Sequence, residues 1–256
     1  MKGRSRRKAL VHFQRKLVPG RFLYRLNRFA AAVEVEGTPA LAHVANSGRL
    51  RELFYPGNRV FLMPRDGKGR KTVYDLALVA VGGTLVSIDA RLPPALVREA
   101  LALRRLPEFN RFTSWRREVR VGDSRLDLLL EGSEGRCYVE TKSVTLVEDG
   151  VGLFPDAPTL RGLRHVRELA RLVAGGCQGT VVFVVQREDA VAFAPNWAAD
   201  PAFAQALQDA VGVGVQVAAY RCRVSLDRVE LLDSVTVRLG SITLPRAKNG
   251  GRRRAP

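Results

Sequence analysis

The chain has little sulfur and comparatively little acid. Its 256 residues include three cysteines, and 25 acidic residues stand against 42 lysines and arginines. Cys137, Cys177 and Cys222 lie far apart in apolar contexts, and no C-x-x-C spacing supports a zinc site. We therefore expect three reduced thiols that are mostly buried.

Long apolar runs are also missing. No stretch approaches the roughly 20 apolar residues that a membrane-spanning helix needs. The basic start, MKGRSRRKAL, lacks the apolar centre of a signal peptide. No membrane partner is expected, and a cytoplasmic location is the default expectation. The apolar fraction, 46%, is ordinary for a folded globular protein.

The positive charge is concentrated at the two ends of the chain. The formal net charge is +17, and residues 1–16 carry seven Lys or Arg and residues 240–256 carry five, with no acid in either segment. This distribution predicts a basic N-terminal arm (1–20) and a basic C-terminal tail (240–256) that bind polyanions with little specificity. Nucleic acid is favoured over membrane because no apolar residues are interleaved. The alternative is that both tails only increase solubility.

The body between the tails divides into two predicted domains. Short β-type runs with close turn signals predict a small barrel, followed by a helix in LPPALVREALALRRL. Then WRREVRV, RLDLLLE and CYVETKSV predict three strands, EDGVGLFPDAP a loop, and TLRGLRHVRELARLVAGG a helix. TVVFVVQ is typical of a buried parallel strand, and DPAFAQALQDAV predicts a second helix with Asp200 as its N-cap. The predicted class is mixed α/β, with domains at 21–103 and 104–239.

Three charged residues interrupt the apolar strands of the second domain. Alternate side chains of a strand share a face, so Glu140 and Lys142 project together, and Asp127 lies near Glu140 if the two strands pair. Two adjacent carboxylates favour a cation between them, and Mg²⁺ or Mn²⁺ prefers such oxygen ligands. Taken alone, the motif favours a solvated strand face, because an Asp followed by Glu-x-Lys occurs often by chance on such faces. The apolar setting favours the functional interpretation, because buried acids need partners.

These segments resemble the sugar fermentation stimulation protein A (SfsA-like) family over roughly residues 21–240. The resemblance rests on SRLDLLL, YVETKSVTL, GLFPDAPTLRGLRHVREL, HVANSGRLRELFYPGNRV and FAPNWAADPAFAQAL. It implies an OB-like β-barrel at 21–103, a PD-(D/E)xK nuclease-like domain at 104–239 and DNA binding with little sequence preference. A role in regulating sugar (maltose) metabolism is also implied. Asp127, Glu140 and Lys142 match the family's D…ExK pattern, and Glu118 matches a further acidic position. Ser47 and Thr141 replace the usual Thr and Val, and neither change removes a ligand.

Two functions follow as hypotheses. The first is a non-specific DNA-binding protein, and the alternative is a nuclease that uses Mg²⁺ or Mn²⁺ on DNA or RNA. The expected catalytic residues are Glu118, Asp127, Glu140 and Lys142, with a metal held by Asp127, Glu140 and the Thr141 carbonyl. The expected nucleic-acid contacts are Arg28, His43, Asn46, Arg49, Arg125, Arg161 and His165. For Asn46, a purely structural role in a turn is an equal alternative. The sequence does not distinguish single from double strands, and it leaves the oligomeric state open.

Overall fold

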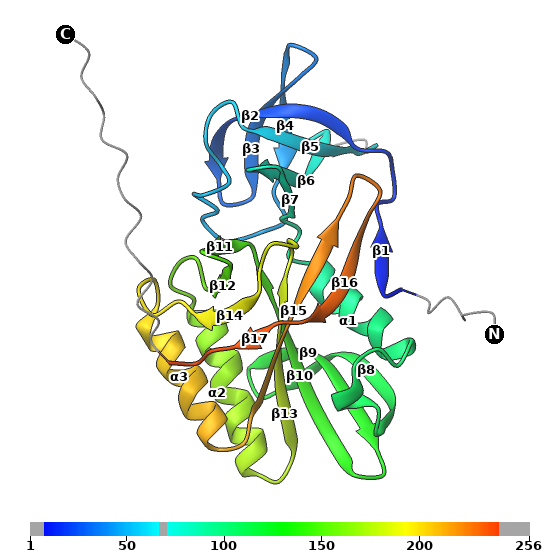
Figure 1. Ribbon diagram of the computed structural model, residues 1–256, viewed down its shortest axis with the longest axis vertical. Coiled ribbons are helices and arrows are strands. Elements are labelled where there is room, and N and C mark those ends of the chain that lie inside the picture. The colour runs from blue at the N-terminus through cyan, green and yellow to red at the C-terminus, as the bar shows by residue number, and fades with distance from the viewer. Residues whose placement is uncertain (1–7, 67–70, 241–256) are drawn as a thin grey trace.

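The computed structural model describes residues 8–66 and 71–240, which form a β-barrel and a larger mixed α/β domain (Figure 1). In Figure 1 the barrel lies above the larger domain, whose helices α2 and α3 pack side by side on one face of the sheet. The parts of the basic ends within 1–7 and 241–256 lie outside the described residues.

The barrel confirms the predicted run of short strands. Its strands are β2 (Val18–Asn27), β3 (Ala30–Val35), β4 (Thr38–His43), β5 (Arg59–Pro64), β6 (Tyr74–Val81) and β7 (Thr84–Ser87). They form a sheet in the order β4-β3-β2-β5-β6-β7, and a parallel pairing of β4 with β6 closes it. Phe22, Val33, Leu62 and Leu76 fill the interior. The barrel thus has a hydrophobic core of its own, as a separate domain requires.

A seven-stranded sheet is the centre of the larger domain. Its order is β1 (Leu10–His12), β16 (Arg228–Ser234), β15 (Gln216–Val224), β13 (Gln178–Val185), β10 (Gly135–Val144), β9 (Ser124–Gly132) and β8 (Phe112–Val121). Strand β13 runs parallel to both β10 and β15, as the apolar run TVVFVVQ predicted. The buried side of α1 (Leu92–Ala102) packs on one face of the sheet, and α2 (Leu160–Ala174) and α3 (Pro201–Gly212) cover the other. The predicted mixed α/β class is confirmed.

The two longer helices begin where the sequence predicted. The Thr159 hydroxyl accepts a hydrogen bond from the Gly162 N–H at the start of α2. The Asp200 carboxylate caps α3 in the same way by accepting from Phe203 N–H, and Pro201 occupies the first turn.

Both limits predicted for the barrel domain differ from those in the structure. Residues 10–12 were expected in a free arm, but they form β1, which pairs with β16 of the larger domain. The helix at 92–102 was assigned to the barrel domain, yet its buried residues Leu96, Val97 and Ala100 pack on Leu128 and Val139 of the larger domain. Local periodicity identifies a helix but not the sheet on which it packs, which explains this error.

A small second sheet was also missed. EDGVGLFPDAP was predicted to be a loop, but β11 (Leu146–Glu148) and β12 (Val151–Phe154) pair with each other there, and β12 pairs with β14 (Ala192–Pro195). Strand β17 (Thr236–Val237) completes the sheet. Strands this short hold too few residues for an alternating pattern to show.

The expected thiols are present. Cys137 and Cys222 are buried, Cys177 is half-buried, and all three are free. Among the helices of the described residues, none is long and apolar enough to cross a membrane.

Candidate functional site

Three acidic residues stand in one row across adjacent strands of the larger domain. Strands β9 and β10 are antiparallel, and their register runs to the pair Leu128 and Val139, which brings Asp127 opposite Glu140. On the other side of β9, the pairs Arg117–Leu128 and Val119–Leu126 bring Glu118 opposite Asp127. The strand pairing on which the sequence argument depended is therefore present.

Glu140 is the buried centre of this row. Its Oε1 accepts hydrogen bonds from Lys142 Nζ and His165 Nδ1, and these two nitrogens lie 3.5 Å apart. The other oxygen, Oε2, is buried and has no hydrogen-bond partner among the residues that the structure describes. Burial alone would raise the pKa of Glu140, but the charge of Lys142 and the hydrogen bond from His165 outweigh it and hold the pKa below its usual value. Glu140 is thus kept ionised with one oxygen still unsatisfied.

Asp127 lies beside Glu140 and is fixed by Thr141. Asp127 Oδ2 accepts a hydrogen bond of 2.8 Å from the Thr141 backbone N–H and one of 2.6 Å from the Thr141 hydroxyl. Burial, and then the charge of Glu140, raise the pKa of Asp127 above its usual value. A second negative charge is therefore unfavourable here unless a cation lies nearby.

The donor set fits a small divalent cation. Within residues 8–66 and 71–240, no group of three or more His, Cys, Asp or Glu side chains is arranged to hold a metal ion. A cation here would depend on the Asp127 and Glu140 carboxylates together with a backbone carbonyl such as that of Thr141. Oxygen ligands of this kind, completed by water, are what Mg²⁺ and Mn²⁺ take. The unsatisfied Glu140 Oε2 is the observation that supports this fit.

The other predicted residues of the larger domain lie at different distances from this centre. Glu118 stands in the row, but its side chain is exposed and lies 3.5 Å from Arg125 in an ion pair. Arg161 is exposed on α2, and its side chain makes no hydrogen bond or ion pair with the described residues. His165 was expected to contact nucleic acid, yet the structure buries it against Glu140. Its place is inside the acidic centre.

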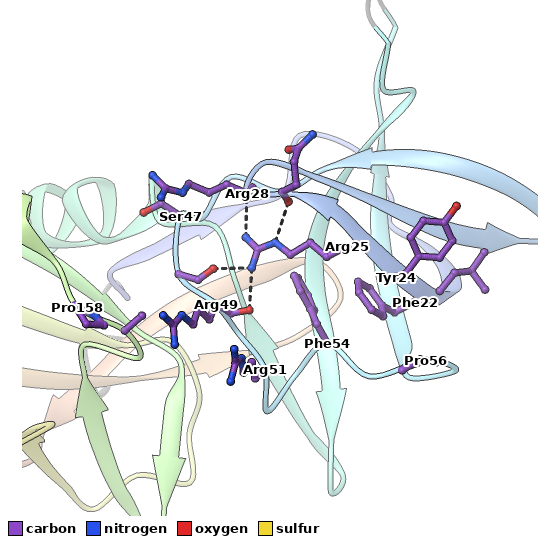
Figure 2. Close-up of a pocket in the computed structure, with 14 residues that line it drawn as sticks. Phe22, Tyr24, Arg25, Arg28, Ser47, Arg49, Arg51, Phe54, Pro56 and Pro158 are labelled. Carbon is purple, nitrogen blue, oxygen red and sulfur yellow. Dashed lines mark hydrogen bonds between the residues drawn. The ribbon is translucent and has the colours of Figure 1, made fainter. Parts of the chain in front are cut away.

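A second feature is a pocket between the barrel and the larger domain. Its volume is about 690 Å³, and Figure 2 shows the side chains around it. The barrel contributes Tyr24, Arg28, Arg49 and Arg51, and the larger domain contributes the wall at 157–158. No hydrogen bond or ion pair connects the side chains of these three arginines to any described residue. Three unpaired guanidinium groups around one pocket form a site for anions.

A fourth arginine, Arg25, shapes the pocket through its hydrogen bonds to the surrounding backbone. Arg25 donates hydrogen bonds to five backbone carbonyls of the loops around it, among them Gly48, Arg49 and Asn46 at 2.6, 2.8 and 3.0 Å (Figure 2). Its guanidinium also lies over the Phe54 ring, 5.4 Å from the centroid. Arg25 therefore holds the loop that carries Arg49 and Arg51.

The same loop is attached to the larger domain by a carboxylate. Asp156 Oδ2 accepts a hydrogen bond of 2.8 Å from the Leu50 N–H. A Cβ at position 48 would lie 2.8 Å from that carboxylate, so only glycine fits there without a shift. Asn46 accepts from Gly48 N–H and donates to the Ile88 carbonyl, which is the turn-building role that the sequence left as an alternative.

His43 was expected at this surface but lies elsewhere on the barrel. Its Nδ1 is 3.7 Å from a carboxylate oxygen of Asp75, which Arg65 and Arg91 also contact. It is absent from the pocket lining, so of the barrel residues predicted to contact nucleic acid only Arg28 and Arg49 reach the pocket.

Sequence reasoning missed Tyr24 and Arg51 at the pocket and the role of His165 in the acidic centre. A signal existed for His165, because it lies on the apolar side of α2 with Val166 and Leu169. No comparable signal existed for Tyr24. Strict alternation would bury it with Phe22, but a bulge between these two residues turns its side chain outward.

The fold and the site together define a class of protein. A closed barrel of the OB type precedes a mixed sheet that carries Asp, Glu and Lys in the D…ExK arrangement. Family profiles agree, since residues 23–88 match "SfsA N-terminal OB domain" and residues 91–228 match "Sugar fermentation stimulation protein RE domain". The chain belongs to the sugar fermentation stimulation protein family.

Similar proteins cover nearly the whole chain. The sugar fermentation stimulation protein homolog of Moorella thermoacetica is 45% identical over 232 residues, which are 90% of this chain and 100% of that protein. The homolog of Desulforamulus reducens is 43% identical and covers 88% and 93%. Among solved structures, that of Pyrococcus furiosus SfsA in complex with Ca²⁺ matches with a TM-score of 0.84 and 33% identity, covering 91% of this chain and 99% of that one.

Proposed function

We propose that this protein binds nucleic acid, chiefly DNA, through the sugar-phosphate backbone and with little sequence preference. The observation that carries the proposal is the set of three unpaired guanidinium groups, Arg28, Arg49 and Arg51, around the barrel pocket. Guanidinium groups bind phosphate oxygens in a bidentate manner, and such contacts position a protein without reading sequence. The net charge of +17 and the OB domain support the same function.

Salt dependence tests this proposal. Each phosphate contact contributes a slope of about 0.9 for duplex DNA in a plot of log affinity against log salt concentration. If Arg49 and Arg51 each bind one phosphate, replacing both by alanine lowers the slope by roughly 1.8. Fluorescence anisotropy with a labelled duplex over a salt series measures it.

The matched control is Arg136→Ala. Arg136 is exposed like the pocket arginines but forms an ion pair with Glu131 at the β9–β10 turn. The Arg136→Ala variant should therefore show the same salt slope as the wild type. A slope that is the same for the Arg49/Arg51 double variant as for the wild type would reject the pocket as the phosphate-binding surface.

The acidic centre supports a second candidate function, hydrolysis of phosphodiester bonds with Mg²⁺ or Mn²⁺. The observation that favours it is the pairing of Asp127 with Glu140, whose Oε2 is buried without a partner. The structure of the Pyrococcus furiosus relative in complex with Ca²⁺, a cation that also takes oxygen ligands, supports the binding of a divalent cation by this fold. A bound cation would supply a water of lowered pKa and would polarise a phosphate.

The side chains of the centre have separate tasks in this candidate reaction. Asp127 and Glu140 would hold the cation, and Thr141 orients Asp127 through two hydrogen bonds. Lys142, a buried ammonium hydrogen-bonded to Glu140, can orient the attacking water or stabilise negative charge as it develops. Glu118 would assist only from the exposed side, because it is paired with Arg125.

A cleavage screen tests the second candidate. Single- and double-stranded DNA and RNA would be incubated with Mg²⁺ or Mn²⁺, and products would be resolved by length. Wild-type protein should produce metal-dependent cleavage that Lys142→Ala abolishes. Equal cleavage by both proteins would point to a contaminating nuclease and would contradict the assignment.

A further inference from the structure

We propose that the barrel pocket takes unstacked nucleotides of a single strand, with one base stacked on Tyr24. This inference rests on the proposed nucleic-acid binding and names the form of the ligand. It is carried by aromatic side chains that line the same pocket as the unpaired arginines.

The pocket joins an exposed aromatic ring to cationic groups. Tyr24 lines the pocket and is 60% exposed, although it is one of the large aromatic residues that usually bury most of their surface. Figure 2 shows Tyr24 on β2, at the opposite side of Arg25 from Ser47 and Pro158. A volume of about 690 Å³ is in the range of pockets that hold small organic ligands. The space therefore suits a nucleotide whose phosphate lies on Arg49 or Arg51.

The aromatic ring is part of a larger exposed face. The register places Tyr24, Ala32 and Leu41 in one row across β2, β3 and β4. Tyr24 and Leu41 are exposed on either side of the buried Ala32, and Phe29 at the β2–β3 turn is 50% exposed. Arg28 lies directly before Phe29 in the chain, so this turn carries a cationic residue next to an exposed aromatic one.

A single strand matches this combination better than a duplex does. The bases of a duplex are stacked on one another inside the helix, and its outer surface offers phosphates to arginines but no base face to an aromatic ring. A single strand presents both, and stacking on an aromatic side chain is tolerant of sequence because every base has a π-face. A protein partner would cover the apolar row, but it would need several carboxylates in matching positions to pair with the three guanidinium groups, whereas a single strand carries a phosphate at every nucleotide.

The experiment compares two ligands and four forms of the full-length chain. Fluorescence anisotropy with labelled dT12 and with a 12-bp duplex would be measured at one salt concentration. The forms are wild type, Tyr24→Ala, Tyr24→Phe and Tyr55→Ala. Tyr55 is the control, since it is 48% exposed on the same barrel but does not line the pocket.

The expected result is a selective loss. Tyr24→Ala should weaken dT12 binding about tenfold, in line with the usual value of one stacked base. Tyr24→Phe retains the ring and should bind dT12 like the wild type, as should Tyr55→Ala. Duplex affinity should change little in all three variants, and the wild type should bind dT12 more tightly than the duplex.

Three outcomes would overturn the inference. Duplex binding at least as tight as dT12 binding, with no effect of Tyr24→Ala, would refute it while leaving the proposed function intact. The second outcome is that Tyr24→Ala binds both ligands like the wild type, while sedimentation velocity shows that the wild type self-associates and the variant does not. This result would assign the face to a second copy of the chain. Failure of the wild type to bind either ligand at low salt would reject the proposed function as well.

Discussion

Replacing Asp127 by asparagine separates the metal-binding role of this side chain from its structural role. An asparagine carbonyl oxygen can accept both hydrogen bonds that Asp127 Oδ2 accepts from Thr141, so the local structure should persist. What the substitution removes is one of the two carboxylates opposite each other on β9 and β10. A cation held by both should then bind far more weakly.

The expected rise in Tm on metal binding follows from the linkage between binding and folding. A ligand at 100 times its Kd stabilises the folded state by about 2.7 kcal/mol. In a domain of 150–250 residues, 1 kcal/mol corresponds to about 2–4 °C in Tm. Saturating Mn²⁺ should therefore raise the Tm of the wild type by about 5–10 °C, and Asp127→Asn should lose most of this rise.

Without metal, the same substitution should raise the Tm. Burial and Glu140 raise the pKa of Asp127, so its carboxylate destabilises the folded state once the pH rises through that pKa. Asparagine carries no charge, and the metal-free variant should melt at a higher temperature than the wild type at pH 7. Below the unfolded-state pKa of aspartic acid this difference should vanish.

Differential scanning fluorimetry with and without 10 mM Mn²⁺ measures both effects. Asp123→Asn is the control, because Asp123 is exposed in the β8–β9 turn and should leave both values unchanged. An Asp127→Asn variant that melts well below the wild type without metal, and that still responds fully to Mn²⁺, would refute the argument.

Other predictions concern the neighbours of this centre, the domain junction and the tails. His165→Ala should weaken Mn²⁺ binding in calorimetric titration, because the imidazole holds Glu140 Oε1. His165→Asn should restore part of the affinity by supplying an N–H donor at a similar position. Equal Mn²⁺ affinities of the wild type and His165→Ala would contradict this. Lys142→Ala should keep the Mn²⁺ response of the Tm while losing any cleavage, and a lost response would show that its role is structural. Gly48→Ala should lower stability by about 1–2 kcal/mol in urea unfolding, because its Cβ displaces the Asp156 carboxylate from Leu50; an unchanged midpoint would argue against that contact. A chain of residues 8–240 lacks four Lys and Arg of the N-terminal end and five of the C-terminal end, and it should bind duplex DNA with a shallower salt slope; an identical slope would show that the tails make no phosphate contacts.

The acidic centre was predictable because strands have a strict period of two. Alternation alone placed Glu140 and Lys142 on one face, and pairing of the two apolar runs across a Gly-rich turn placed Asp127 opposite Glu140. The helix caps at Thr159 and Asp200 follow from local chemistry in the same way. Features set by near neighbours in the chain are those that the sequence predicts well.

Features set by distant segments were not predictable in this way. The short strand β1 depends on an edge that β16 offers more than 200 residues later. The pocket depends on two domains meeting at Gly48 and Asp156, and on a bulge that turns Tyr24 outward against the alternation of its strand. Helix periodicity gave the start of α1 and its buried face, but it extended the helix beyond Ala102 and did not give the domain on which it packs.

The most direct test of nucleic-acid binding at the barrel is chemical protection of its arginines. Wild-type protein would be treated with phenylglyoxal in the presence and absence of dT12, and modified arginines would be located by peptide mass spectrometry. Arg28, Arg49 and Arg51 should be protected by the oligonucleotide, whereas Arg136, at the β9–β10 turn, should react equally in both samples. Equal modification of the three pocket arginines with and without dT12, under conditions where anisotropy shows binding, would contradict the account.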